Sequence, residues 1–546
     1  MRAAGLGIVL ALLAGPAAAA AGQAPGRPGQ AREAGESPGV IRGIVTDAAT
    51  GKPLRRARIR VFPDGPDFRV RQIVANTNSR GQFEVKDVPP GFYLVAGARA
   101  GYLDIQYGQR RTRERGVAVE VRGGQTVERI DLALPRGGIL AGRVTDDLGE
   151  AYPGVRVDAL GMQYDNGKRQ IFVAGSTTTD DLGQFRLSGL PPGGYYVAAT
   201  STETWRNDKK ETIGYSATYY PGGPVDQAQQ LTLAPSEHKG ELHLSLHAGR
   251  AARISGRVVR ASGEPVPGAG VSMAYSYPGV IMVAGMRSVR AGGDGAFTIR
   301  DVPGGVYNIS SGGDSAILTV TGADVNDVVL TQRVGSTVRG VVLTDEGAPP
   351  PFPTSGVRVF IEAPGGKVLP TVRVVDVAVD WTFTMQNLGG PFLFRMTGLP
   401  DDWMLAHAEL DEKRVSDEPW DVPTGGREFS GLKMVLTRKI GRFTGTVVDA
   451  DGRATSAATV VLFPDDDAKW MPASRLIRST RPGSDGRFSI SQLPAGTYRA
   501  AALEFVENGQ WDDPAFLSTL RDTAERFVLI EGGAQVLTLK LPAPAR

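Results

Sequence analysis

Apolar and polar residues alternate along most of the chain, in short runs that end in Gly, Pro and Asp turns. Residues 180–200, DDLGQFRLSGLPPGGYYVAAT, show the pattern most clearly. A period of two predicts β-strands, because successive side chains of a strand point to opposite faces. Asp-Leu-Gly and Pro-Pro-Gly supply turns, since Gly adopts positive φ and Pro fixes φ. We therefore predict a β-hairpin here, with Tyr196, Ala198 and Thr200 along its second strand.

This hairpin recurs along the chain. Further copies are predicted at residues 80–96 (RGQFEVKDVPPGFYLVA), 294–309 (DGAFTIRDVPGGVYNI) and 485–500 (DGRFSISQLPAGTYRA), with a damaged copy at 394–405 (FRMTGLPDDWML). An opening strand before each hairpin carries a central glycine. These glycines are Gly43, Gly142, Gly256, Gly340 and Gly445. Glycine weakens a strand interior, so its repetition predicts that another backbone or a large ring packs against it.

The opening glycines lie roughly 85–115 residues apart, which is the spacing of domains. Gly/Pro/Asp turns and short strands within each unit predict an all-β chain, a tandem array of five seven-stranded antiparallel β-sandwich modules. Residues 517–526 are the best helix candidate. The predicted divisions are a signal peptide at 1–21, a flexible leader at 22–39, and modules at 40–136, 137–248, 249–333, 334–439 (divergent) and 440–546. Because the linkers between modules are short, we expect a semi-rigid string.

Composition narrows the possible chemistry. A chain of 546 residues with 41% hydrophobic content is long enough for several cores. The absence of cysteine excludes disulfides, thiolate metal sites and a cysteine nucleophile. A net charge of +3, from 61 basic and 58 acidic residues, gives no reason to expect nucleic-acid binding. Arg2, an apolar run at 6–13 and small residues at 16–21 predict an export signal, and no later stretch is long enough to span a bilayer as a helix.

The repeated motifs resemble those of a known family. G-x-V-x-D, a polar turn with Gly-x-Pro, an Ala-x-Val strand, D-x-x-G-x-F and L-P-P-G-x-Y are similar to the carboxypeptidase regulatory-like domain. The matches are best at residues 43–93, 142–196 and 445–498. This resemblance implies a seven-stranded, transthyretin-like (prealbumin-like) sandwich among the starch-binding-like folds. The fourth module departs from it, since Pro400-Asp401-Asp402-Trp403 replaces the Pro-Pro-Gly-x-Tyr turn.

Catalytic and metal sites are not expected. His238 and Glu241 match H-x-x-E, but a zinc peptidase site would need His407 as well and a large α/β domain that the sequence lacks. His243 and His247 lie about 13 Å apart on one strand, too far to share a metal at about 2.1 Å. Paired Asp residues suit turns better than the spaced ligands of a calcium loop. Isopeptide bonds need core Lys and Asn, and the opening strands carry outward Arg. We predict no cofactor and no metal.

Aromatic residues give the one candidate binding site. Trp205, Tyr215, Tyr219 and Tyr220 lie between the regular strands, where exposed rings can stack on sugar faces. A second series, directly after the Pro-Gly turns, is predicted to be structural. Its members are Tyr93, Tyr196, Tyr307 and Tyr498.

The sequence thus predicts a non-enzymatic, exported binding or scaffold protein of the bacterial envelope, located in the periplasm, on the outer surface or outside the cell. Its partner is expected to be a protein or a glycan. One alternative is a dedicated carbohydrate-binding protein, supported by fold analogy and the loop aromatics. A second is an accessory or regulatory subunit of a peptidase. Any function is expected in the stretches that do not repeat, namely 161–176, 201–230, 275–290, 410–427 and 507–526.

Overall fold

The computed structural model describes residues 37–64, 72–277, 280–364 and 374–542. The predicted signal peptide at 1–21 and most of the predicted leader lie outside these ranges. The described residues form strands that pair into sheets, and the sheets group around five principal hydrophobic cores. The prediction of an all-β chain of sandwiches is confirmed. We number the sandwiches 1 to 5 in chain order.

Sandwich 1 packs two sheets around a core that includes Ile41, Ile59 and Tyr93. One sheet has the order β4-β1-β8 with β9 also on β1, and the other has the order β3-β2-β5-β6 with β7 also on β5. Its strands are β1 (Gly39–Asp47), β2 (Arg58–Pro63), β3 (Ile73–Asn76), β4 (Gln82–Val88), β5 (Gly91–Ala98), β6 (Ile105–Gln106), β7 (Val119–Val121), β8 (Thr126–Val127) and β9 (Leu132–Leu134).

Sandwich 2 has the sheets β13-β10-β19 and β12-β11-β14-β17, with β18 also on β14. A small additional sheet, β15-β16-β20, lies at its boundary with sandwich 3. The strands are β10 (Gly138–Thr145), β11 (Arg156–Asp165), β12 (Lys168–Thr178), β13 (Gln184–Leu190), β14 (Gly193–Thr200), β15 (Thr204–Arg206), β16 (Thr212–Tyr215), β17 (Thr218–Tyr219), β18 (Leu231–Leu233), β19 (His238–Ser245) and β20 (Ala248–Arg250).

Sandwich 3 has the sheets β24-β21-β27 and β23-β22-β25-β26. Its core includes Ile254, Met273 and Tyr307. The strands are β21 (Ala252–Arg260), β22 (Gly270–Tyr277), β23 (Val280–Arg290), β24 (Ala296–Val302), β25 (Gly305–Ser311), β26 (Asp314–Val320) and β27 (Val325–Gln332).

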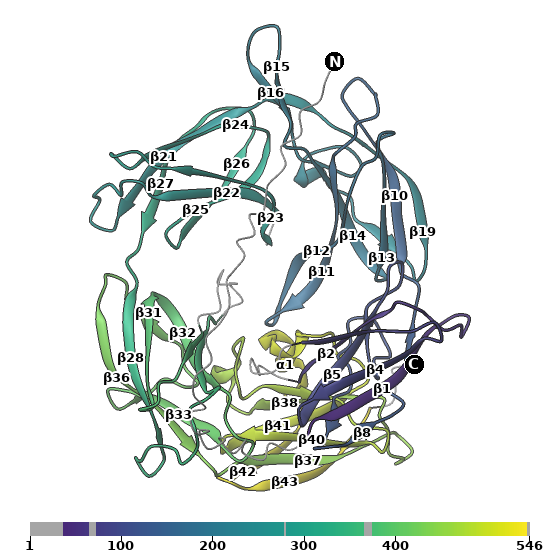
Figure 1. Cartoon of the computed structure of the whole chain (residues 1–546), viewed down its shortest axis with the longest axis vertical. Helices are drawn as coiled ribbons and strands as arrows, with labels where there is room; N and C mark the ends of the chain where they lie inside the picture. The colour runs from purple at the N-terminus through teal and green to yellow at the C-terminus, as the bar shows by residue number, and fades with distance from the viewer. Residues whose placement is uncertain (1–36, 65–71, 278–279, 365–373, 543–546) are drawn as a thin grey trace, which may run out of the picture.

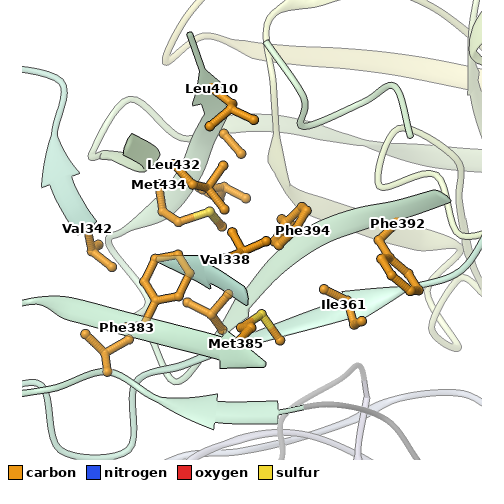
Figure 2. Close-up of a cluster of buried hydrophobic side chains, with 14 of the residues drawn as sticks. Val338, Val342, Ile361, Phe383, Met385, Phe392, Phe394, Leu410, Leu432 and Met434 are labelled. Carbon is orange, nitrogen blue, oxygen red and sulfur yellow. The ribbon is translucent and has the colours of Figure 1, made fainter. Parts of the chain in front are cut away.

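Sandwich 4 is the divergent one. An extra strand, β33, pairs with β36 and extends the first sheet to β31-β28-β36-β33-β34, opposite β30-β29-β32-β35. Valines of β28, methionines of its neighbours β31 and β36, and phenylalanines of β31 and of the facing strand β32 fill its core (Figure 2). The strands are β28 (Ser336–Thr344), β29 (Arg358–Glu362), β30 (Val374–Asp376), β31 (Thr382–Leu388), β32 (Gly390–Thr397), β33 (Met404–Leu410), β34 (Lys413–Arg414), β35 (Trp420–Val422) and β36 (Glu428–Thr437).

Sandwich 5 has the sheets β40-β37-β43 and β39-β38-β41-β42, and it carries the one α-helix in the described ranges. Helix α1 (Pro514–Leu520) begins earlier than predicted, because Asp513 caps its first turn by accepting from the amide of Ala515. Residues 525–529 are a strand, since Phe527 and Leu529 alternate into the core. The strands are β37 (Gly441–Val448), β38 (Thr459–Pro464), β39 (Arg478–Thr480), β40 (Arg487–Leu493), β41 (Gly496–Leu503), β42 (Glu525–Leu529) and β43 (Ala534–Lys540).

The first and last strands of each sandwich are paired in parallel, a feature that the antiparallel prediction does not include. The pairs are β1 with β9, β10 with β19, β21 with β27, β28 with β36 and β37 with β43. Parallel neighbours run in the same direction, so the chain enters a sandwich at one end and leaves it at the other. This connectivity joins the sandwiches end to end.

The central glycines of the opening strands contact the closing strand, as predicted. A Cβ at Gly43, Gly142 or Gly256 would lie under 3.0 Å from the carbonyl oxygen of Ile130, Leu242 or Val328, respectively. The same holds for Gly340 and Gly445, where a phenylalanine ring is also close. The glycine is therefore required by the close approach of two backbones.

The damaged hairpin of sandwich 4 is not at residues 394–405. It is formed by β31 and β32, and residues 398–403 are the connection to β33. Trp381, with φ of 64°, stands where the other hairpins have a left-handed glycine, and Phe392 stands where they have the core tyrosine. The copy was misplaced because both residues that mark the motif are replaced.

The sandwiches do not form a string. They follow one another around a ring, and sandwich 5 returns to lie against sandwich 1 (Figure 1). Hydrogen bonds between residues 108–116 and residues 479–508 connect the first and last sandwiches directly. The linkers alone do not predict this closure, because it depends on contacts between loops that are far apart in the sequence.

Candidate functional site: the junctions between sandwiches

The four predicted binding aromatics do not share one surface. Trp205 on β15 packs against Tyr215 on β16, with ring centroids 4.8 Å apart. Tyr215 is only 5% exposed, because Tyr152 covers another side of its ring at 4.9 Å. Trp205 is 36% exposed and is the most accessible of the four. Stacking on a sugar face needs an open ring face, so in this set Trp205 offers the best one.

Tyr219 and Tyr220 lie elsewhere. Tyr219 is 4% exposed and belongs to an apolar cluster with Leu160, Ala198 and Tyr277, the last from sandwich 3. Tyr220 is half-buried against the core of sandwich 2. Glycan contact by these four residues stays a prediction.

The tyrosines after the Pro-Gly turns are structural, with one correction. Tyr93, Tyr307 and Tyr498 are buried and each donates its hydroxyl to the carbonyl of the proline four residues earlier. In sandwich 2 this residue is Tyr195, which donates to Pro191 at 2.6 Å, and not Tyr196. Two tyrosines follow the turn in this copy, and only the first has the spacing of four. Tyr196 therefore points away from the core of its own sandwich.

The junction between sandwiches 2 and 3 is apolar with a buried polar contact. Tyr277 donates its hydroxyl to Asp158 Oδ2 at 2.7 Å, and Asp158 is completely buried. Arg156 reaches the same carboxylate at 2.9 Å. Tyr275 donates to the carbonyl of Ser201 at 3.1 Å. Because an apolar cluster surrounds this hydrogen bond, the junction holds the two sandwiches in one orientation.

Sandwiches 1 and 2 meet beside Tyr102, whose carbonyl oxygen lies next to Gly189 of sandwich 2. Within sandwich 1, the Arg136 guanidinium lies over the Tyr102 ring, 5.1 Å from its centroid, and the Tyr102 hydroxyl donates to Asp47 at 2.9 Å. This hydrogen bond, together with backbone amides of the Asp47 turn, lowers the pKa of Asp47 to about 2. The backbone of Gly137 also bonds to Gly101 at 3.1 Å.

Sandwiches 1 and 5 are joined by a buried ion pair. Glu114 and Arg481 lie 3.2 Å apart, and both side chains are 1% exposed. Arg481 also donates to the carbonyl of Gly108 at 2.6 Å. Burial lowers the pKa of Arg481, and the Glu114 carboxylate opposes that shift. A charge in this position is tolerated only with its partner, since desolvation of an unpaired charge is costly.

Arg113 places the same loop against two further partners. Its carbonyl accepts from the amide of Asn508 at 2.7 Å, and its guanidinium lies 3.4 Å from Glu507, both in sandwich 5. It also donates to the carbonyl of Met162 in sandwich 2 at 2.5 Å. Residues 108–116 are therefore held between sandwiches 1, 2 and 5.

Two more arginines of this loop reach sandwich 5. Arg111 pairs with Glu504 on the exposed rim, and Arg115 bonds to Asp64 and to the carbonyl of Ser479. Sequence reasoning missed this loop, although four arginines within residues 110–115 were a visible signal.

Sandwich 2 contacts sandwich 5 through the tip of the β11–β12 hairpin. The amide of Gly167 donates to the carbonyl of Gly509 at 3.2 Å. A Cβ at Gly167 would lie under 3.0 Å from the backbone of Asp512, so the hairpin tip covers that residue. Burial raises the pKa of Asp512 to about 7; Arg478 opposes the rise, and Glu362 and Asp165 add to it.

Sandwiches 4 and 5 are joined by arginines that bind backbone carbonyls. Arg475 pairs with both carboxylate oxygens of Asp417, at 2.7 and 2.9 Å, and donates to the carbonyl of Ala406 at 2.8 Å. Arg395 of sandwich 4 donates to the carbonyl of Ala473 at 3.0 Å. Burial raises the pKa of Asp417, but the hydrogen bonds and charge of Arg475, together with Arg395 and Ser416, lower it overall.

Sandwiches 3 and 4 differ from the other neighbours. Within the described ranges, no hydrogen bond, ion pair or ring contact connects a strand of sandwich 3 to a strand of sandwich 4. The chain passes between them through residues 333–335, and Val334 accepts amides from Gly425 and Gly426 of sandwich 4. Among the described residues, the linker at 333–335 is therefore what connects sandwich 3 to sandwich 4.

The histidines do not assemble. His238, on β19, and His407, on β33, belong to different sandwiches, and His243 and His247 are exposed as predicted. In the part of the chain that the structure describes, no group of three His, Asp or Glu side chains is arranged to hold a metal ion. None of the helices in the same ranges has the length and apolar character of a membrane span.

The stretches that do not repeat form the junctions. Residues 161–176 and 507–526 meet between sandwiches 2 and 5, and residues 410–427 supply Ser416 and Asp417 to the junction of sandwiches 4 and 5. Residues 201–230 and the described part of 275–290 meet between sandwiches 2 and 3. The segments that differ between repeats therefore serve largely to fix the arrangement of the sandwiches.

Comparison with known proteins identifies the first two sandwiches. The sequence profile of the carboxypeptidase regulatory-like domain matches residues 40–135 and 139–232. No curated protein matches the chain.

Solved structures with similar domains are of low identity. The Bacillus anthracis TIE protein is 11% identical over 74% of both chains, with a TM-score of 0.15. A streptococcal ancillary pilin is 13% identical over 54% of this chain and 98% of its own, with a TM-score of 0.19. The minor pilin GBS52 of Streptococcus agalactiae is 15% identical over 38% of this chain and 95% of its own, with a TM-score of 0.21.

Proposed function

Since the chain is a tandem carboxypeptidase regulatory-like domain protein, we propose that it is a non-enzymatic scaffold or binding protein, exported to the bacterial envelope. The observation that carries this proposal is the use of the non-repeating segments. They build junctions, such as Glu114–Arg481 and Tyr277–Asp158, and not a pocket with converging polar groups. The described residues thus present the outer surfaces of the sandwiches to partners.

A pull-down from native envelope tests this proposal. The full chain should be recovered from the envelope or the medium with its N-terminus near residue 22, and it should capture a protein or glycan partner. A chain found in the cytoplasm with an intact N-terminus would contradict the export proposal. Capture of no partner, or turnover of a substrate by the purified chain, would contradict the scaffold.

A dedicated carbohydrate-binding role is the second candidate, and the exposure of Trp205 favours it. A glycan array with wild-type protein and Trp205→Ala separates the two. Loss of a specific glycan signal in the variant supports sugar binding through this ring. Equal binding by both proteins, or no binding by either, rules out this role. Tyr219→Ala is a poorer probe, because it would also disturb the junction with sandwich 3.

A role as a peptidase accessory subunit rests on the family resemblance alone. It predicts that a peptidase co-purifies with the full chain. If no peptidase is found in the envelope pull-down, this role is excluded.

A further inference from the structure

We propose that the chain is a clasp with two arms: sandwiches 1–3 form one arm, sandwiches 4 and 5 form the other, and the ring opens and recloses where sandwich 5 meets sandwiches 1 and 2. We call that meeting surface the latch. On the first arm it comprises residues 108–116 and the β11–β12 tip, and on the second arm residues 478–481 and 504–513. The inference goes beyond a static scaffold, because it gives the ring two states.

Each arm is internally fixed. In the first arm, the buried cluster that contains Tyr219 and Tyr277 spans sandwiches 2 and 3. Ser236 of sandwich 2 donates its hydroxyl to the carbonyl of Arg136 in sandwich 1 at 3.1 Å. In the second arm, Arg475 and Arg395 insert between sandwiches 4 and 5 and bind carbonyls on the opposite side. Removing either guanidinium would leave buried acceptors without a donor, so each arm is expected to move as a unit.

The arms are connected covalently at one place. Residues 333–335 lead from β27 to β28, and the strands on either side make no hydrogen bond or ion pair across the gap in the described ranges (Figure 1). Few contacts cross a boundary of this kind, and relative motion is the default expectation for domains so joined. This linker is the pivot.

The latch is polar, whereas the junction between sandwiches 2 and 3 in the first arm is apolar. Its contacts are Arg–carboxylate pairs, bonds to backbone and the Arg111 guanidinium over the Phe505 ring at 5.6 Å, and none of the buried hydrophobic clusters in the described residues spans it. Arg111 and Glu504 are about half exposed, at 52% and 46%, so salt screens their attraction. Polar, ion-paired surfaces of this kind are typical of contacts that dissociate.

Crosslinking tests the latch directly, because the chain has no cysteine of its own. Arg111→Cys with Glu504→Cys places one thiol on each arm. Arg42→Cys with Glu128→Cys, from an exposed pair within sandwich 1, is the matched control. A short bismaleimide should join the latch pair within single chains, and at least fivefold less when Glu114→Lys is added to the pair, because a like charge then faces Arg481. The control yield should not change.

Small-angle scattering supplies the second measurement, on the full chain. Glu114→Lys puts a like charge against buried Arg481, so the radius of gyration should rise while circular dichroism and thermal unfolding still report folded sandwiches. A Gly-Ser insertion after Val334 should leave the radius unchanged, because the latch holds the ring. A radius unaffected by Glu114→Lys, or crosslinks formed mainly between chains, would overturn the clasp. A larger radius of gyration caused by the Gly-Ser insertion alone would also overturn the clasp.

Discussion

Glu114 of sandwich 1 forms a buried ion pair with Arg481 of sandwich 5, although the two residues come from opposite ends of the described chain. Glu114 also accepts from the backbone amides of Arg110 and Arg111, at 2.9 and 3.1 Å. One carboxylate thus orders the loop that carries the latch and binds the arginine that docks against it.

Glu114→Gln should weaken ring closure strongly. It leaves the Arg481 guanidinium buried without a counter-charge, and breaking a buried pair costs about 3–5 kcal/mol. Hydrogen exchange should accelerate in residues 108–116 and 504–513. Arg42→Gln, which breaks an exposed pair with Glu84, should cost about 0–1 kcal/mol and leave these segments protected. Equal protection in both variants would mean that the pair does not hold the ring.

Tyr195→Phe and Tyr196→Phe should differ, although the residues are adjacent. Tyr195→Phe leaves the part-buried Pro191 carbonyl without its donor and should lower stability by about 1–3 kcal/mol. Tyr196 is half-buried on the other face of the strand. Removal of its hydroxyl should therefore change the free energy of unfolding by no more than about 0.5 kcal/mol. Calorimetry of the full chain measures both. The reverse order would contradict the assignment of Tyr195 to the repeated series.

Gly142→Ala should destabilise sandwich 2. The added methyl group would overlap the Leu242 carbonyl, and overpacking of this kind costs about 1–3 kcal/mol. Gly270→Ala is the control, since its Cβ would meet open space at an ordinary φ. That substitution should be neutral or slightly stabilising, because alanine restricts the unfolded chain. Denaturant unfolding of the two variants compares them; a Gly142→Ala protein as stable as wild type would refute the close packing.

Ring closure should weaken as the pH rises toward 7. The pKa of Asp512 is raised by burial from 3.8 to about 7, so the closed ring binds this proton more tightly than an open ring that exposes the carboxyl to water. The contribution of this proton to the stability of the closed ring is complete below pH 3.8, decreases between pH 3.8 and 7, and is lost above pH 7. Between pH 6 and pH 8 the closing equilibrium should fall by up to about tenfold.

Crosslinking of the latch pair across this pH range measures that dependence. Asp512→Asn, which cannot ionise, should flatten the profile. An unchanged profile in Asp512→Asn would assign the dependence to another group.

The repeated hairpins show how far a sequence predicts this structure. Alternation, turn residues and the opening glycines define the sandwiches, because these signals are local and act within a few residues. The motif fails where its marker residues change: Trp381 and Phe392 hide the fourth hairpin, and a doubled tyrosine shifts the register to Tyr196. In both places the fold is retained by packing that the motif does not describe.

The arrangement of the sandwiches is not encoded in the same way. Arg113 and Met162, or Gly167 and Gly509, meet only after each sandwich has folded, and neither residue of a pair carries a local signal for the other. Burial of Tyr215 and Tyr219 is equally non-local, since residues of other strands cover them. The arginines at 110–115 were the one visible indication of a docking surface.

The parallel pairing of first and last strands determines how each sandwich responds to tension. Force applied through the neighbouring sandwiches acts along β10 and β19 in opposite senses, so their ladder is loaded in shear and its hydrogen bonds resist together. An antiparallel terminal pair would instead be peeled open bond by bond. Single-molecule pulling on the full chain should therefore show high, abrupt rupture events for individual sandwiches; smooth extension at low force would exclude this mechanical role. A surface protein built from such units would resist drag.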